Sequence, residues 1–249
     1  MKRRALLSVT DKSHLDHVAS LLASYDYELL ASGGTAAWLH DHGFAVTDVE
    51  SVTGFPEIFG GRVKTLHPLI HGGILGPSHE EFADPDLAPL GLAPIDVVVV
   101  NLYRFEDALA SGTAPAELIE QIDIGGPAML RAAAKNHQRV TLLTSPDQYD
   151  EFLHECRAGD GMPSAAFRRR CALAGLRLTA AYDAAIASWL ATQVSGHAAE
   201  ATEAAAAPTR RVALRYGENP HQQAALVVPE HPGGVIVALK PLLASLVIP

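Results

Sequence analysis

Two cationic side chains, Arg62 and Lys64, stand in the stretch GGRVKTLHP at residues 60–68, and they are the only Lys or Arg residues between Ser13 and Tyr103. Arg grips a phosphate or carboxylate in a planar fork, whereas Lys supplies a mobile point charge. In an extended segment, the two side chains would point the same way into one cleft. The pair therefore predicts a site for an anionic ligand, with solvated surface positions as the alternative.

Polar turns that follow two predicted strands are a second indication of a binding site for an anion. Ser8 and Lys12 belong to the run SVTDK, and the run SGGT at residues 32–35 follows YELLA. Glycines allow close approach of the backbone, and the next helix offers free N–H groups and the positive end of its dipole. A turn with a capping hydroxyl would also explain SGGT. The prediction of a phosphate site thus depends on both turns taken together with Arg62 and Lys64.

Further candidates follow the apolar run VVVV and surround a Gly-Gly turn. Asn101 and Tyr103 come directly after the apolar run, Asp123 stands before the turn, and Lys135 lies further along the helix that the turn opens. A helix N-cap is the simpler role for Asp123, and a surface position is the simpler one for Lys135. The chain has no G-x-S-x-G, P-loop, HExxH or G-x-G-x-x-G motif, and its histidines show no metal-ligand spacing. We therefore predict chemistry by Lys, Asp, Tyr and Asn without a metal.

The elements that must position these residues alternate between strand and helix patterns over the first 150 residues. Strands are predicted at 5–9, 27–32, 45–49, 95–103 and 139–145, and helices at 13–25, 33–43, 111–122 and 125–136. This order implies right-handed βαβ units and an α/β fold with a doubly wound, mainly parallel sheet flanked by helices. Ligands bind such sheets at the carboxyl ends of the strands, where the candidate residues fall.

Beyond residue 150 the pattern changes. Residues 165–193 predict a long helix, structural in packing or as an oligomer face, and the Ala-rich residues 195–211 predict a linker. We expect a domain at 1–150, a helical extension at 151–196 and a remainder at 197–249, with residues 195–249 poorly ordered.

Composition excludes several classes of protein. The chain has 249 residues and a formal net charge of −9, without the basic stripe that a nucleic-acid binder needs. Its apolar runs are too short for a signal peptide or a membrane span. Cys156 and Cys171 offer neither a disulfide framework nor a metal site. We expect a cytoplasmic protein that binds neither nucleic acid nor membranes.

Several stretches identify a family because they occur together and in order: SVTDK, LLASGGTAAWL, VESVTGFPEIFGGRVKTLHPLIHGGIL, VVVVNLYRFEDAL, EQIDIGGPAMLRAAAKNHQRVTLL, TAAYDAAIA and LRYGENPHQ. Over roughly residues 3–225 they resemble the IMP cyclohydrolase part of the bifunctional purine-biosynthesis enzymes, AICAR formyltransferase/IMP cyclohydrolase. The resemblance implies a methylglyoxal-synthase-like domain that works without a cofactor as a homodimer, with dimer contacts in the helical extension. Its reaction would close the pyrimidine ring of formyl-AICAR ribotide, a purine ribotide, to give IMP and water.

The resemblance also implies roles for the candidate residues. Lys64 and Tyr103 would stabilise the formyl oxygen and manage its proton, Asp123 would orient or deprotonate the attacking amide, and Lys135 would support the charge. The implied phosphate cradle is Ser8, Lys12, Ser32, Gly34 and Thr35, and the other implied substrate-binding residues are Arg62, Thr65, Asn101, Gly125 and Gly126.

One departure from the family concerns the last residues. In the bifunctional enzymes RYGENPHQ opens a formyltransferase domain, but residues 228–249 do not resemble its continuation. We therefore expect residues 197–249 to be a linker and the truncated or diverged start of that domain, and we expect no formyl transfer from a folate donor. The alternatives are a methylglyoxal-synthase-like lyase, which would need its own carboxylate pattern, and a non-catalytic regulatory domain or inactive remnant that binds a nucleotide or phosphate.

Overall fold

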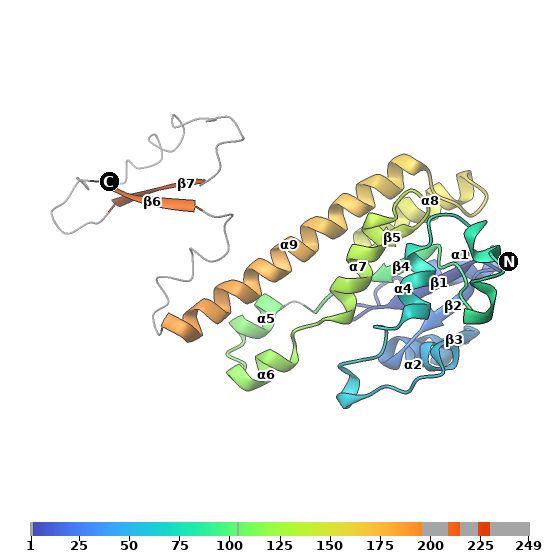
Figure 1. Ribbon diagram of the computed structural model, residues 1–249, viewed down its shortest axis with the longest axis horizontal. Helices are drawn as coiled ribbons and strands as arrows, with labels where there is room; N and C mark the ends of the chain where they lie inside the picture. Colours follow the sequence, from blue (N-terminus) through green and yellow to red (C-terminus); the bar gives the residue numbers. More distant parts are fainter. Residues whose placement is uncertain (1, 104, 196–208, 215–223, 230–249) are drawn as a thin grey trace. The chain divides into compact units, whose positions relative to one another are not determined.

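The computed structural model describes residues 2–103, 105–195, 209–214 and 224–229. The chain divides into two compact units, Met1–Asp183 and Ala184–Pro249, and the helix α9 (Ala165–Ser195) crosses the boundary between them (Figure 1). The second unit contains an antiparallel pair of strands, β6 (Thr209–Leu214) and β7 (Ala224–Pro229). The rest of the predicted remainder at 197–249 lies outside the described residues, and the predicted boundaries at 150 and 196 stay predictions.

The first unit is built on a parallel five-stranded sheet with the order β3-β2-β1-β4-β5. The strand order reverses between β1 and β4, so the predicted doubly wound α/β fold is confirmed. The strands are β1 (Arg4–Ser8), β2 (Glu28–Ala31), β3 (Val46–Asp48), β4 (Val97–Val100) and β5 (Thr141–Leu143).

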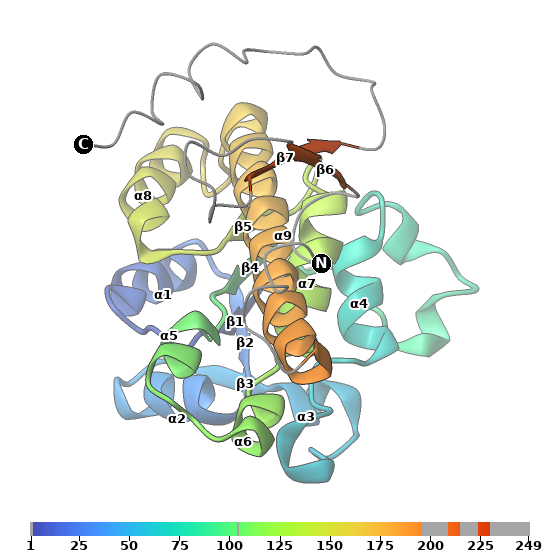
Figure 2. The same ribbon diagram turned by 90° about the vertical axis from the view of Figure 1, so that its left-hand side faces the viewer.

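Helices cover both faces of this sheet, which explains why all four valines of β4 are buried. Figure 2 shows α1, α2 and α8 on one side of the sheet and α4 and α7 on the other. Their bounds are α1 (Leu15–Ser24), α2 (Gly33–Asp41), α4 (Pro68–Leu75), α7 (Gly125–Lys135) and α8 (Tyr149–Ala158). None of the helices in the described part of the chain is both long and apolar enough to span a membrane.

The helix predicted at 111–122 is shorter in the structure, because within this range residues 115–120 alone are helical, and a separate short helix precedes the range. α5 (Phe105–Ala110) ends before Gly112, whose φ of 74° is incompatible with a continuing helix. α6 (Pro115–Glu120) then begins with a proline at its first position. The short helices α3 (Val49–Thr53) and α5, together with α4 and α8, were not predicted.

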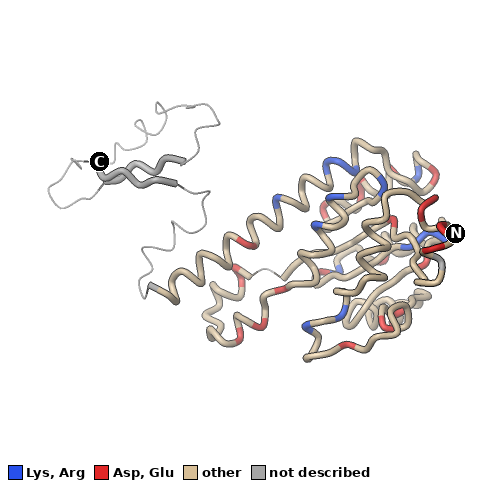
Figure 3. The backbone as a smooth tube through the Cα atoms, in the orientation of Figure 1, with Lys and Arg blue, Asp and Glu red and all other residues tan. Residues whose placement is uncertain are grey.

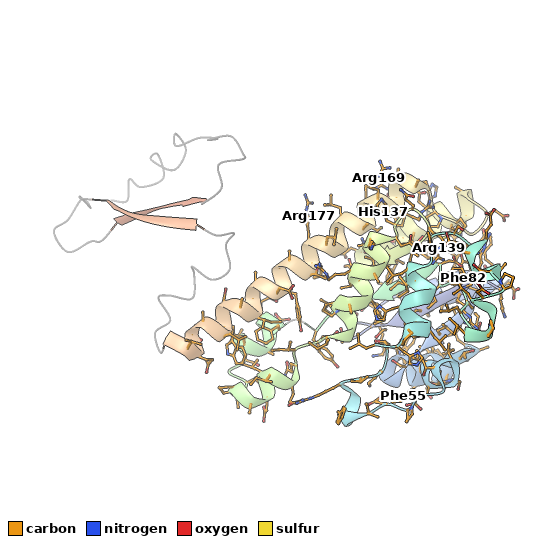
Figure 4. All side chains as sticks on the ribbon, in the orientation of Figure 1. Phe55, Phe82, His137, Arg139, Arg169 and Arg177 are labelled. Carbon is orange, nitrogen blue, oxygen red and sulfur yellow. The ribbon has the colours of Figure 1, made fainter. Side chains whose placement is uncertain are left out.

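A buried ion pair between Asp96 and Arg139 stabilises the fold at the amino end of β4. This end of the sheet is opposite to the carboxyl ends of the strands, where the candidate residues lie. Arg139 donates to Asp96 Oδ1 at 2.8 Å, and His79 Nε2 lies 2.7 Å from the same oxygen. The guanidinium lies 5.5 Å from the centre of the Phe82 ring (Figure 4). Burial lowers the pKa of Arg139, and the Asp96 carboxylate opposes this effect. The guanidinium also donates to the carbonyl oxygens of Gly73, Ile74, Gly76 and Ile95.

Replacing Arg139 by Met is expected to lower the free energy of unfolding by about 3–5 kcal/mol, because it removes the cation that compensates a fully buried carboxylate. Urea unfolding followed by circular dichroism measures the change. The matched control is Arg170→Met, since Arg170 forms an exposed ion pair with Glu151. That control should change the free energy by less than about 1 kcal/mol. Equal losses in the two variants would contradict the prediction.

Candidate active site

A pocket of about 980 Å³ lies at the carboxyl ends of the strands. It is next to β1 and β4, between which the strand order of the sheet reverses. This volume suits a nucleotide-sized ligand. Residues from β1, α2, the 60–66 segment, the segment after β4, the 119–124 segment and the start of α7 meet there. The structure brings together the candidates Ser8, Lys12, Ser32, Gly34, Thr35, Arg62, Lys64, Thr65, Asn101, Tyr103, Asp123, Gly125 and Gly126.

The Asn101 side chain stabilises the turn that follows β1 through hydrogen bonds. Its Oδ1 accepts hydrogen bonds from Thr10 N at 2.6 Å, Thr10 Oγ1 at 2.7 Å and Asp11 N at 3.1 Å. Its Nδ2 donates to Asp11 O at 2.9 Å. The predicted substrate-binding residue therefore also positions the turn that carries Lys12, a role that the sequence pattern did not indicate.

Thr35 plays a similar part at the start of α2. Its buried hydroxyl accepts from Val9 N at 3.0 Å and donates to Val9 O at 3.1 Å, which ties the first turn of the helix to the end of β1. The N-cap residue Ser32 makes no side-chain capping hydrogen bond. Thr35 N donates to Ser32 O at 3.3 Å. In contrast, the Ser32 side chain leaves the N–H groups of Gly33 and Gly34 uncapped, so these two groups can bind an anion in the pocket.

Lys64 reaches the same turn from the other side of the pocket. Its Nζ lies 2.8 Å from Glu57 Oε2, and both side chains are about one-third exposed. A Cβ atom added to Gly33 would come within 3.2 Å of Lys64 Nζ, so the ammonium group lies beside the SGGT turn. Glu57 was not predicted as a site residue, although it belongs to the family stretch GFPEIFGGRVKTLHP.

Arg62 binds a different carboxylate, because the segment is not extended at this residue. Its φ and ψ of −63° and −26° are helical, and they follow the 3₁₀ turn η1 (Phe59–Gly61). The exposed guanidinium donates through Nε to Glu120 Oε2 at 3.1 Å and through Nη2 to Glu120 Oε1, and this pairing raises the pKa of Arg62. Glu120 ends α6, and α5 and α6 carry acidic residues and no Lys or Arg (Figure 3). The two cations thus have separate partners, unlike the common direction expected from an extended segment.

Asp123 is held where α7 begins. Its Oδ1 accepts a hydrogen bond from Gly126 N at 3.0 Å, so its carboxylate binds the first turn of α7 as a cap would, although Ile124 occupies the N-cap position itself. A Cβ atom on Gly126 would lie 2.2 Å from Asp123 Oδ2, which explains why glycine occupies this position. A Cβ atom on Gly125 would lie 2.8 Å from the Oγ1 of the buried Thr65. The first turn of α7 therefore packs closely against two candidate site residues.

Two predicted catalytic residues differ in their placement. Tyr103 lines the pocket and is 60% exposed. Lys135 is exposed at the last residue of α7, about 15 Å along the helix axis from Gly125 at the usual rise per residue. Among the described residues, Lys135 is the one candidate that does not line the pocket. The sequence placed it on the correct helix, but the direction of α7 carries it away from the carboxyl edge of the sheet.

The fold and the pocket define an MGS-like domain, and the MGS-like domain family matches residues 14–128. The AICARFT/IMPCHase bienzyme family matches residues 133–242. Among solved structures, the crystal structure of ForH is 36% identical with a TM-score of 0.65, and the match covers 74% of this chain and 95% of that one. The chain belongs to the AICARFT/IMPCHase family, as the resemblance of its motifs implied.

Curated relatives carry the name "Bifunctional purine biosynthesis protein PurH". The relative from Cereibacter sphaeroides is 49% identical over 236 residues, which are 94% of this chain and 44% of the relative. The relative from Synechococcus elongatus is 51% identical over 226 residues, which are 90% of this chain and 44% of the relative. The chain thus spans less than half the length of these relatives.

Proposed function

We propose that this protein is an IMP cyclohydrolase that closes the ring of 5-formamidoimidazole-4-carboxamide ribotide to give IMP and water. The observation that carries the proposal is one pocket that joins an uncapped helix start to Lys64, Tyr103 and Asp123. Membership of the AICARFT/IMPCHase family supports it. The lining of the pocket would hold both ends of the substrate, the phosphate and the reacting amides.

The ribotide phosphate would lie at the start of α2, where the helix N–H groups and Lys12 offer positive charge. The carboxamide nitrogen would then attack the formyl carbon, so that a C–N bond forms and the carbonyl electron pair moves to the formyl oxygen. Lys64 and Tyr103 would stabilise that oxygen by hydrogen bonds. Holding both groups of one substrate in contact supplies a large part of the rate enhancement.

Ring closure is completed by proton transfers. Asp123 would accept the proton that the attacking amide nitrogen loses. The formyl oxygen would take one proton from Tyr103 or Lys64 to become a hydroxyl group, and a second proton from the other of these two residues would let it leave as water. The lone pair of the former formamide nitrogen would form the C=N bond as that nitrogen loses its N–H proton. This proton and the one held by Asp123 would restore Tyr103 and Lys64. The atoms balance as substrate going to IMP and one water, with no cofactor in the reaction.

Incubating the purified protein with the formyl ribotide tests this function, with IMP identified by chromatography and its formation followed by absorbance. Ring closure supports the proposal. Binding of IMP without turnover would favour a non-catalytic regulatory domain instead. Release of methylglyoxal from dihydroxyacetone phosphate would favour a lyase.

We also propose that the protein forms a homodimer in the cytoplasm. Leu173 and Leu176 of α9 are 49% and 45% exposed, and exposed apolar side chains on one helix favour an interface between subunits. Sedimentation velocity tests the assembly, because the mass of one chain is 26.4 kDa. A sedimenting species of twice that mass is expected, and a monomer at all concentrations would contradict the proposal.

A further inference from the structure

Tyr182 of α9 forms hydrogen bonds to the backbone of two residues that line the candidate active site, although Tyr182 itself does not line the pocket. Its hydroxyl oxygen accepts a hydrogen bond from Asp123 N at 2.8 Å and donates to Gln121 O at 3.3 Å. Gln121 and Asp123 line the pocket, whereas Tyr182 is not among the residues that line it. The side chain is 4% exposed. Tyr182 therefore contacts the backbone of the site, and ligand in the pocket would not touch it.

The ring of Tyr182 is itself held in place. It packs edge-on against Phe105 of α5, with the ring centres 6.4 Å apart and the planes at 78°. Phe105 is fully buried. Burial raises the pKa of Tyr182, so the hydroxyl keeps its proton at neutral pH and can donate as well as accept. This arrangement forms a rigid support behind the segment 121–123.

Hydrogen bonds therefore hold Asp123 at two places, its backbone N–H group and its side-chain carboxylate. Tyr182 holds its backbone N–H, and Gly126 N holds its carboxylate Oδ1. Because Oδ1 is committed to the start of α7, the proton transfer proposed for Asp123 falls to Oδ2. The position of Oδ2 in the pocket then depends on where the backbone of Asp123 is held.

We propose that Tyr182 is a positioning residue for ring closure, which sets the place of the Asp123 carboxylate through its backbone. The inference rests on the proposed cyclohydrolase function. It gives the helical extension a part in catalysis, where the sequence had indicated packing or an oligomer face. A displacement of about 1 Å in a reacting group can cost up to about a hundredfold in rate, so loss of this support should be measurable.

The test compares Tyr182→Phe with the matched control Tyr27→Phe. Tyr27 is also 4% exposed, and its hydroxyl donates to Gly161 O at 3.0 Å. It precedes β2, at the amino ends of the strands and thus opposite to the pocket. Tyr182→Phe should lower kcat about tenfold with KM changed by less than about threefold. Tyr27→Phe should leave both constants unchanged, and equal kcat values in the two variants would overturn the inference.

A double-mutant cycle separates positioning from a general loss of stability. In an Asp123→Asn background, Tyr182→Phe should lower kcat no further, because the carboxylate through which it acts is already gone. Melting temperatures of the two single variants and the double variant show whether a loss of stability accompanies the loss of kcat. If the two kcat losses multiply as independent effects, Tyr182 does not act through Asp123 and the inference fails.

Hydrogen exchange provides a readout that does not need enzymatic activity. Tyr182→Phe should speed exchange of the Asp123 amide, whose acceptor it removes, and Tyr27→Phe should leave that amide unchanged. Unchanged exchange in Tyr182→Phe would overturn the inference. If the wild-type protein does not close the ring, the proposed function fails by itself, and the exchange experiment still decides whether Tyr182 holds this segment.

Discussion

Lys64→Ala is expected to lower kcat for ring closure by about a hundredfold or more. The substitution removes the cation that would face the formyl oxygen while negative charge develops on it, and loss of one such group commonly costs this much. Lys64 is part of the pocket and is paired with Glu57, so its removal leaves the buried core of the domain intact. Steady-state kinetics on the formyl ribotide measures the effect.

The matched control is Arg62→Ala, which removes the neighbouring cation. Arg62 is exposed and paired with Glu120, and we assign it to substrate binding. It should raise KM and leave kcat within a few-fold of the wild-type value. If Lys64→Ala instead raises KM and spares kcat, the ammonium group binds the phosphate at the SGGT turn, and its catalytic assignment is wrong.

Asp123→Asn is expected to lower kcat by about 10²–10⁴, the usual contribution of a general base. The amide oxygen of Asn can still accept the hydrogen bond from Gly126 N, so the start of α7 should keep its structure. The amide cannot take a proton from the attacking nitrogen at neutral pH. Kinetics together with thermal unfolding separate the chemical effect from any loss of stability.

Asp84→Asn is the control for this substitution. Asp84 Oδ1 also accepts a backbone hydrogen bond, from Asp86 N at 2.9 Å, but Asp84 does not line the pocket. This variant should match the wild type in both kinetic constants. A kcat for Asp123→Asn within a few-fold of the wild-type value would show that Asp123 acts through orientation alone.

The sheet and the main location of the site could be predicted because both depend on local patterns. The run VVVV has the length and composition of a strand buried on both faces, and β4 is such a strand. The turns after β1 and β2 carry small and polar residues, which predicted a ligand edge before any contact was known. Chain order alone then placed these turns at the same edge of a parallel sheet.

The contacts that organise the site could not be predicted, because they join residues far apart in the sequence. Glu120 is 58 residues from Arg62, and Tyr182 is 59 residues from Asp123. No period or motif indicates which carboxylate meets which cation. That Lys135 does not line the pocket has a related reason: its helix was predicted, but the direction of that helix relative to the pocket is a property of tertiary packing.

The pairing of Lys64 with Glu57 and of Arg62 with Glu120 also bears on which solutes can compete for the pocket. Both cations are neutralised before a ligand arrives, so a simple monovalent anion gains little by displacing a carboxylate already in contact. A phosphate dianion carried on a larger molecule gains the helix N–H groups and the other pocket contacts as well. Chloride should therefore be a poor inhibitor, and a ribotide product should be a much better one.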